Sequence, residues 1–144
     1  MNAQNNVKVV QQMFAALGQG DLKAALESYA ENVDFRSPVT RTKSAEISWS
    51  KPRHSREEIA AFFKELSEVV AIERMEPMEI TANEDRVIVE GRNRFNVRSS
   101  GRSFEHDWVM VFKLQKDKIV RNWHYYDTAD ILAAIHELAP LMLC

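Results

Sequence analysis

The sequence predicts an α+β fold in which helices pack over one face of a mainly antiparallel sheet. Two kinds of periodicity support this prediction. Apolar residues recur at helical spacing in the early part of the chain and at its end, whereas residues 71–126 alternate with a period of two. Only short turns separate the strands of that middle part, and short turns join antiparallel neighbours. Helices gathered before and after a run of hairpins are typical of α+β proteins.

The composition is that of one compact domain spanning residues 1–144. Hydrophobic residues make up 45% of the chain, and the net charge of −2 argues against a general nucleic-acid-binding protein, which would need a basic face. The single cysteine, Cys144, excludes an internal disulfide and a cysteine-based zinc site. The N-terminus has no signal-peptide pattern, and no apolar run approaches the ~20 residues of a membrane span. We therefore expect a cytoplasmic protein with no membrane and no nucleic-acid partner.

The first part of the chain predicts two helices and a strand. Residues 5–17 have one apolar face, and Gly18 ends this helix. Asp21 can cap a second, shorter helix, whose apolar face extends to Tyr29. A short strand of alternating apolar residues then runs up to Pro38.

Residues 39–54 show no period and are predicted to form a loop. The loop contains Trp49 and a group of basic side chains, Arg41, Lys43, Lys51 and Arg53. Its positive charge could guide an anionic ligand to a pocket. The interpretation that we favour is a solvated surface loop.

The rest of the chain predicts a helix, four strands and a final helix. Ser55 and Glu58 form a capping-box pattern that opens the third helix. Turn-forming residues separate four long extended segments, residues 71–82, 86–98, 103–115 and 118–126. Asp127 caps the final helix, which is expected to end before Pro140.

Several short segments, taken in this order, resemble a known family. They are Val9-Val10-Gln11-Gln12, Gly20-Asp21-Leu22, Ile47-Ser48-Trp49, Gly101-Arg102-Ser103-Phe104 and Tyr125-Tyr126-Asp127-Thr128. The chain thereby resembles, over nearly its whole length, the SnoaL-like branch of the nuclear transport factor 2-like superfamily, which also includes ketosteroid isomerase, limonene epoxide hydrolase and scytalone dehydratase. This resemblance implies a cone-shaped half-barrel made by a strongly curved sheet, with a pocket in its mouth. It also implies a homodimer formed through the outer face of the sheet.

The catalytic residues of the best-known members do not carry over to this sequence. By the resemblance, Met13 and Met110 stand where the steroid isomerase has its two oxyanion donors, and Ser37 stands where it has its general-base aspartate. A methionine can neither donate a strong hydrogen bond nor take a proton. The arginine and paired aspartates of the epoxide hydrolase fall near Gly91, Asn93 and His124. We therefore expect neither of these two mechanisms, because a shared fold does not fix the chemistry of the site.

The pocket can be predicted from strand parity, because side chains alternate between the two faces of a sheet. The resemblance assigns the even residues of 103–115 and 118–126 and the odd residues of 86–98 to the concave face. The expected ligand-binding residues are Phe14, Trp49, Phe62, Phe95, His106, Trp108, Met110 and Asn122. An apolar, aromatic cavity with a few polar groups is typical of a small-molecule site.

His124 is the strongest catalytic candidate. A histidine in a desolvated cavity is biased to its neutral form, which can take a proton near pH 7 as a general base. Asn93, Asn122 and Tyr126 could orient His124 or hold a carbonyl oxygen, so Asn93 and Tyr126 join His124 as expected catalytic residues. The alternative is a hydrogen-bonded core histidine without a catalytic role. His106 and His124 could hold a metal in principle, but no carboxylate shares their face, so we expect neither a metal nor a cofactor.

The outer face of the sheet is expected to carry cross-strand ion pairs and the residues of a subunit interface. Arg92 and Arg94 are predicted to pair across strands with Glu105 and Asp107, and Trp123 is predicted to pack at a subunit interface.

Three functions remain open at this stage. The first is a cofactor-independent isomerase, cyclase, hydratase or hydrolase acting on a small, largely apolar metabolite by acid–base chemistry. The second is a non-catalytic binding or carrier protein, and the third is a dimeric interaction module. The polar residues grouped with His124 favour the first, whereas the missing acidic pairs favour the second.

Overall fold

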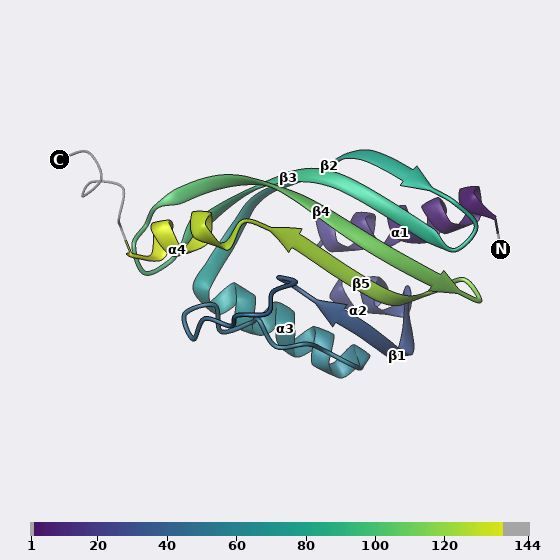
Figure 1. Ribbon diagram of the computed structural model, residues 1–144, viewed down its shortest axis with the longest axis horizontal. Coiled ribbons are helices and arrows are strands. Elements are labelled where there is room, and N and C mark those ends of the chain that lie inside the picture. The colour runs from purple at the N-terminus through teal and green to yellow at the C-terminus, as the bar shows by residue number, and fades with distance from the viewer. Residues whose placement is uncertain (1, 137–144) are drawn as a thin grey trace.

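The computed structural model describes residues 2–136, which form helices and one five-stranded sheet (Figure 1). The elements are α1 (Ala3–Gly18), α2 (Leu22–Glu27), β1 (Tyr29–Arg36), α3 (Arg56–Val69), β2 (Val70–Ala82), β3 (Arg86–Val97), β4 (Ser103–Gln115), β5 (Lys118–Tyr126) and α4 (Thr128–His136). The strand order is β1-β5-β4-β3-β2, and β1 alone runs parallel to its neighbour. Figure 1 shows a long curved sheet, with α1, α2 and α3 on one side and α4 at one end. The predicted α+β fold, with a strongly curved and mainly antiparallel sheet, is confirmed.

The helix starts are fixed by the side chains that the sequence identifies as caps. Asp21 accepts a hydrogen bond from the backbone N–H of Ala24 at 3.0 Å, and Ser55 accepts one from Glu58 at 3.1 Å. Asp127 accepts one from the backbone N–H of Ala129 at 2.9 Å, at the start of α4. Tyr29, expected on the second helix, begins β1 instead, because its backbone pairs in register with β5.

Strand parity is as predicted for the three central strands. In β3 and β4 buried and more exposed residues alternate along most of each strand. The buried set faces α1 and α3, whose Val10, Met13, Ile59 and Phe62 belong to the same apolar core. Packing of these helices on one face creates the concave side of the sheet, where the polar residues predicted for the pocket also lie.

The outer face carries cross-strand ion pairs, as predicted. Arg92 pairs with Asp107 at 3.0 Å, and Arg94 pairs with Glu105 at 3.5 Å. Trp123 also points to this face, where its ring lies between two guanidinium groups. Arg36 is 4.6 Å and Arg121 is 3.6 Å from the ring centroid.

The segment 39–54 is a loop, but Arg53 does not belong to a solvated surface. Its side chain is 4% exposed and pairs with Glu65 of α3. Arg53 also donates to the backbone carbonyls of Trp49 at 3.2 Å and Lys51 at 3.0 Å, while its own backbone bridges to Phe35 of β1. The surface interpretation is therefore wrong for Arg53, because this residue fixes the loop to β1 and α3.

Two predicted features, Pro140 after the last helix and Cys144, lie outside the described residues. Within residues 2–136, no helix has both the length and the apolar character needed to cross a membrane.

Candidate functional site

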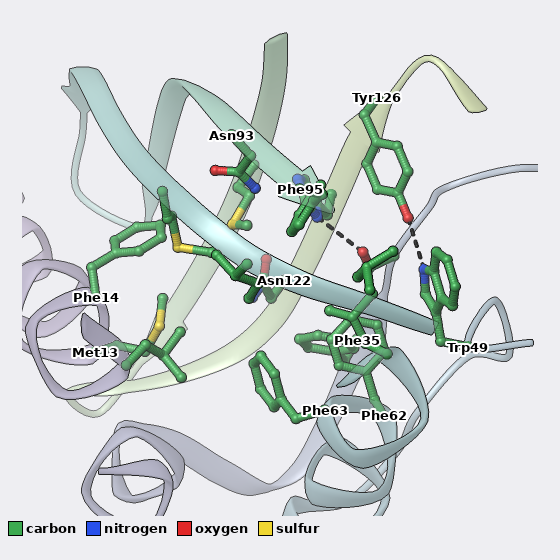
Figure 2. Close-up of a pocket in the computed structure, with 18 of the residues that line it drawn as sticks. Met13, Phe14, Phe35, Trp49, Phe62, Phe63, Asn93, Phe95, Asn122 and Tyr126 are labelled. Atoms are coloured by element: carbon green, nitrogen blue, oxygen red, sulfur yellow. Dashed lines mark hydrogen bonds between the residues drawn. The ribbon is translucent and has the colours of Figure 1, made fainter. Parts of the chain in front are cut away.

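A cavity lies between the concave face of the sheet, helices α1 and α3, the loop 39–54 and the first turns of α4. It contains about 660 Å³ of space free of protein atoms, its open mouth included. All but one of the predicted site residues line it, namely Phe14, Trp49, Phe62, Asn93, Phe95, His106, Met110, Asn122, His124 and Tyr126. Figure 2 shows aromatic side chains of the helices facing the polar side chains of the strands across this space.

Trp108 is the exception and does not line the cavity. Its indole packs beneath the lining, stacked on Phe14 with ring centroids 6.0 Å apart. Gly91, the cross-strand neighbour of Trp108, leaves the necessary room, because a Cβ at Gly91 would clash with the indole, at 2.6 Å from Cε2 and closer still to Cζ2. The indole N–H donates to Asn93 Oδ1 at 2.7 Å. Trp108 therefore holds Asn93 in place rather than contacting a ligand.

His124 is buried and hydrogen-bonds a residue that the sequence analysis did not connect with it. The Ser37 hydroxyl lies 2.9 Å from His124 Nδ1. The expectation that Asn93, Asn122 or Tyr126 orients His124 directly is wrong. Asn93 is bound to Trp108, and Asn122 donates to the Tyr29 hydroxyl at 2.8 Å.

Tyr126 is hydrogen-bonded to Trp49 and not to His124. Its hydroxyl accepts a hydrogen bond from Trp49 Nε1 at 3.0 Å (Figure 2), and the nearby Ser37 side chain lowers the pKa of Tyr126. Two hydrogen-bonded pairs, Trp49 with Tyr126 and Ser37 with His124, thus lie side by side. They come from the loop 39–54, from β5 and from the residue that follows β1.

The direction of the Ser37–His124 hydrogen bond decides where His124 carries its proton. An indole N–H can only donate, so the Tyr126 oxygen accepts from Trp49. If the Ser37 hydroxyl donates to Nδ1 of His124, the neutral ring carries its proton on Nε2.

The pKa values in the cavity follow from burial. Desolvation, with a smaller contribution from His106, lowers the pKa of His124 from 6.5 to about 3. The pKa of His106 is also lowered by burial, but Asp130, Asp107 and Asp127 oppose this shift. Burial raises the pKa of Tyr126 to about 12. The predicted neutral state of His124 is confirmed, whereas a pKa this low makes His124 a weak general base.

Several polar atoms of the lining have no hydrogen-bond partner in the described part of the chain. They are Asn93 Nδ2, Asn122 Oδ1, His124 Nε2 and both ring nitrogens of His106. These side chains are each at most 8% exposed. Such atoms are rare in folded proteins, because an unpaired buried polar group costs ~1–3 kcal/mol.

Sequence reasoning missed Ser37, Tyr29 and several apolar lining residues, among them Phe35, Phe63 and Met75. Ser37 enters the sequence analysis only as the residue that stands in the place of a general-base aspartate. That correspondence could have identified Ser37 as a pocket residue, because the aspartate it replaces belongs to the catalytic site. Residues 2–136 contain no group of three or more histidine, cysteine or acidic side chains that could hold a metal ion.

A curved five-stranded sheet with helices over its concave face and a cavity between them defines the nuclear transport factor 2-like class of α+β folds. The family model of the SnoaL-like domain matches residues 10–122. The chain belongs to this SnoaL-like family.

Solved structures with the same fold agree with this assignment. A nuclear transport factor 2-like protein from Burkholderia xenovorans LB400 is 32% identical, with a TM-score of 0.79 over 93% of this chain and 98% of that chain. A proposed polyketide cyclase from Xanthomonas campestris pv. campestris is 19% identical, with a TM-score of 0.75 over 92% of this chain and 98% of that one. TerC, co-crystallised with polyporic acid, is 20% identical, with a TM-score of 0.78 over 93% of this chain and 97% of its own. The last two show the fold alone. No curated protein matches the chain.

Proposed function

We propose that this protein binds a small, largely apolar carbonyl compound in the cavity and catalyses a proton transfer on it without a cofactor, as an isomerase or cyclase does. One observation carries the proposal. Asn93 Nδ2 and His124 Nε2 are buried nitrogens that line a mostly apolar cavity and have no partner among the described residues. Asn93 Nδ2 is a donor, and His124 Nε2 is one in the arrangement proposed here, in which Ser37 donates to Nδ1. A carbonyl oxygen is the acceptor that two such donors fit.

The chemistry of these donors suits a developing negative charge. Fixed hydrogen-bond donors in a site that excludes water stabilise an oxyanion strongly, and removal of one donor typically costs ~10²–10³-fold in rate. A neutral imidazole with a low pKa serves this purpose well, because it donates a hydrogen bond without giving up its proton. His124 is therefore proposed to polarise the carbonyl rather than to act as the general base.

The remaining lining favours a flat hydrocarbon body for the ligand. Aromatic side chains enter from α1 (Phe14), β1 (Phe35), α3 (Phe62 and Phe63) and β3 (Phe95). TerC, which shares this fold, was crystallised with a small organic molecule, polyporic acid. The proposed polyketide cyclase from Xanthomonas supports a cyclisation among the candidate reactions.

The proposal can be tested with 2-tetralone, a flat ketone with exchangeable protons next to its carbonyl. We expect millimolar 2-tetralone to shift the NMR signals of the cavity residues and the protein to accelerate exchange of these protons for deuterium in D₂O. The double variant Ser37→Ala/His124→Phe removes the donor without leaving a serine stranded, and it should lose ~10²–10³-fold in exchange rate. His54→Phe, at an exposed histidine, is the matched control and should retain full activity. Absence of both binding and exchange would contradict the proposal.

A second candidate function is a non-catalytic carrier of an apolar molecule. The part of the lining that the structure describes contains no aspartate or glutamate, and this favours binding over turnover. Binding of 2-tetralone without any acceleration of exchange would support the carrier function.

We also propose that the protein forms a homodimer through the outer face of the sheet. Tyr125 and Ile88 on this face are each 39% exposed, and Met78 is 64% exposed. Sedimentation at micromolar concentration should give twice the chain mass of 16.6 kDa. A stable species of single-chain mass would favour a monomer.

A further inference from the structure

We infer that His106, rather than His124, is the residue that takes the proton from the substrate and returns it. This inference rests on the proposed function above and names the general base that the function requires. Among residues 2–136, the cavity lining contains two histidines and no carboxylate, and we seek the base between these two histidines. The hydrogen bonds of the two rings distinguish them.

In His124, Nδ1 is hydrogen-bonded to Ser37, and Nε2 carries the proton in the proposed arrangement. Its Nδ1 lies 2.9 Å from the Ser37 hydroxyl, which donates to it in the arrangement proposed above. To accept a proton at Nε2, the ring would first have to move its existing proton to Nδ1. The Ser37 proton would then have to turn away from Nδ1. His124 is therefore built to donate a hydrogen bond.

His106 has no such commitment. Neither of its ring nitrogens has a hydrogen-bond partner in the described residues, although the side chain is only 5% exposed. The ring is held by aromatic contacts alone, with centroids 5.4 Å from Phe95, 5.5 Å from Phe104 and 5.1 Å from Tyr126. The unprotonated nitrogen of the neutral ring, whichever of the two it is, can thus take a proton without breaking a hydrogen bond.

Position and charge around His106 also suit a base. It lies directly across the β3–β4 ladder from Asn93, the proposed carbonyl donor. Three carboxylates favour its protonated form: Asp130 of α4, Asp127 before α4, and Asp107 on its own strand. The β5 residues that face it are His124 and Tyr126, and burial keeps both uncharged near neutral pH. No carboxylate contributes in this way at His124.

The proposed step is balanced within the cavity. A His106 nitrogen takes a proton from the carbon next to the substrate carbonyl, so that the C–H bond breaks and an N–H bond forms. The electron pair moves into the carbonyl group, and the resulting enolate oxygen is held by Asn93 Nδ2–H and His124 Nε2–H. Return of the proton to a second carbon completes an isomerisation. Attack of the enolate carbon on a second carbonyl, with the proton delivered to the new alkoxide, completes a cyclisation.

Imidazole NMR on the unaltered full-length protein is the first test, and it needs no substrate. Long-range ¹⁵N–¹H spectra should show His124 as the Nε2–H tautomer, with no protonation in the pH range where His106 titrates. A His124 ring protonated on Nδ1 alone, or one that protonates at higher pH than His106, would overturn the inference.

Deuterium exchange of 2-tetralone is the second test. His106→Asn should lose ~10²–10⁴-fold in exchange rate, which is the usual contribution of a general base, while 2-tetralone still shifts the cavity signals. His54→Asn, the same change at the exposed histidine, should have no effect. If His106→Asn does not fold, His106→Gln provides the same comparison, and the NMR test stands in either case.

The outcomes separate this inference from the function on which it rests. If His106→Asn keeps the exchange rate of the unaltered protein while Ser37→Ala/His124→Phe loses it, His106 is not the base and the proposed function stands. If the unaltered protein neither binds nor exchanges 2-tetralone, the proposed function fails. The tautomer and titration order would then still show whether the two rings differ as inferred.

Discussion

The two faces of the sheet treat their polar side chains in opposite ways. On the convex face, polar residues are charged and well exposed, and they pair with each other: Arg94 and Glu105 are each 42% exposed and 3.5 Å apart. On the concave face the polar residues are neutral and buried, and Asn93, only two residues along β3 from Gly91, is 1% exposed with a free amide donor. The difference follows from solvent, because burial disfavours charge and makes each unpaired polar atom costly.

This comparison teaches which polar residues carry information about function. A surface ion pair contributes little to stability, and its two charged groups are partners of each other. Its presence therefore gives little information about a ligand. A buried polar atom with no partner in the protein lowers stability, so its presence points to a partner from outside the chain, such as a bound ligand that forms the missing hydrogen bond. Among residues 2–136, five of the eight such atoms line one cavity, on three neighbouring strands, and the other three belong to Asn6, Arg121 and Trp123.

The largest difference between the faces should appear at Gly91. A Cβ at this position would clash with the Trp108 ring, at 2.6 Å from Cε2 and closer still to Cζ2, and would lie 2.6 Å from the Glu76 carbonyl oxygen. Gly91→Val should therefore destabilise the protein by about 3 kcal/mol or more, through overpacking on the concave side. Glu90→Val, at the adjacent residue that is exposed on the other face, should change stability by only about 0.5 kcal/mol. Urea unfolding of both variants measures the contrast, and equal effects would contradict it.

The next effect is a dependence of stability on pH that comes from the concave face. The pKa of His124 is lowered from 6.5 to about 3 in the folded protein. As the pH falls below 6.5, His124 is therefore protonated in the unfolded chain but stays neutral in the folded protein. The stabilisation is complete above this pH and is lost progressively as pH falls toward 3. Between pH 7 and pH 5 we expect a loss of about 2 kcal/mol from this group, and burial of His106 acts in the same direction.

Urea unfolding at the two pH values measures this loss. The double variant Ser37→Ala/His124→Phe should show a correspondingly flatter profile, and His54→Phe should retain the full slope. A profile that does not change in the double variant would show that His124 is not buried as a neutral ring.

A smaller effect is expected where concave polar atoms do find each other. Tyr29 and Asn122 are hydrogen-bonded at 2.8 Å inside the core. Tyr29→Phe leaves the Asn122 amide without its partner and should cost about 1.5 kcal/mol. Tyr29→Phe/Asn122→Leu, which removes both polar groups, should cost less than the sum of the two single changes. Strict additivity in this double-mutant cycle would mean that the pair does not interact.

How far the sequence predicts this molecule depends on how local each feature is. The caps at Asp21 and Ser55 and the parity of β3 to β5 depend on residues close together in the chain, so the order of elements and the concave face could be predicted. The partner of His124 could not, because Ser37 is 87 residues away in the chain. The hydrogen bond from Trp49 to Tyr126 could not be predicted either, because Trp49 lies in a loop without any period.

Two further errors have the same origin. Trp108 has the right parity for the cavity, but the space above Gly91 lets its indole pack beneath the lining, and no pattern in either strand shows this. Arg53 belongs to a segment with the composition of a surface loop. It is nevertheless buried, because it pairs with Glu65 on α3 and its backbone bridges to Phe35. Each error concerns a contact between separate elements, for which periodicity carries no signal.

The smallest effect is expected on the convex face, at the pair Arg94 and Glu105. Both side chains are 42% exposed, and Arg94 also lies 3.7 Å from Glu73 while Glu105 also contacts Arg74. An exposed pair gains little Coulomb energy in water and loses side-chain entropy, so the coupling between Arg94→Ala and Glu105→Ala should be only ~0.2–1 kcal/mol. It should fall further at 1 M salt, where charges are screened beyond ~3 Å, whereas the Tyr29–Asn122 coupling should not change. Urea unfolding of both cycles at low and high salt measures this, and a salt-independent Arg94–Glu105 coupling larger than that of Tyr29–Asn122 would reverse the contrast between the two faces.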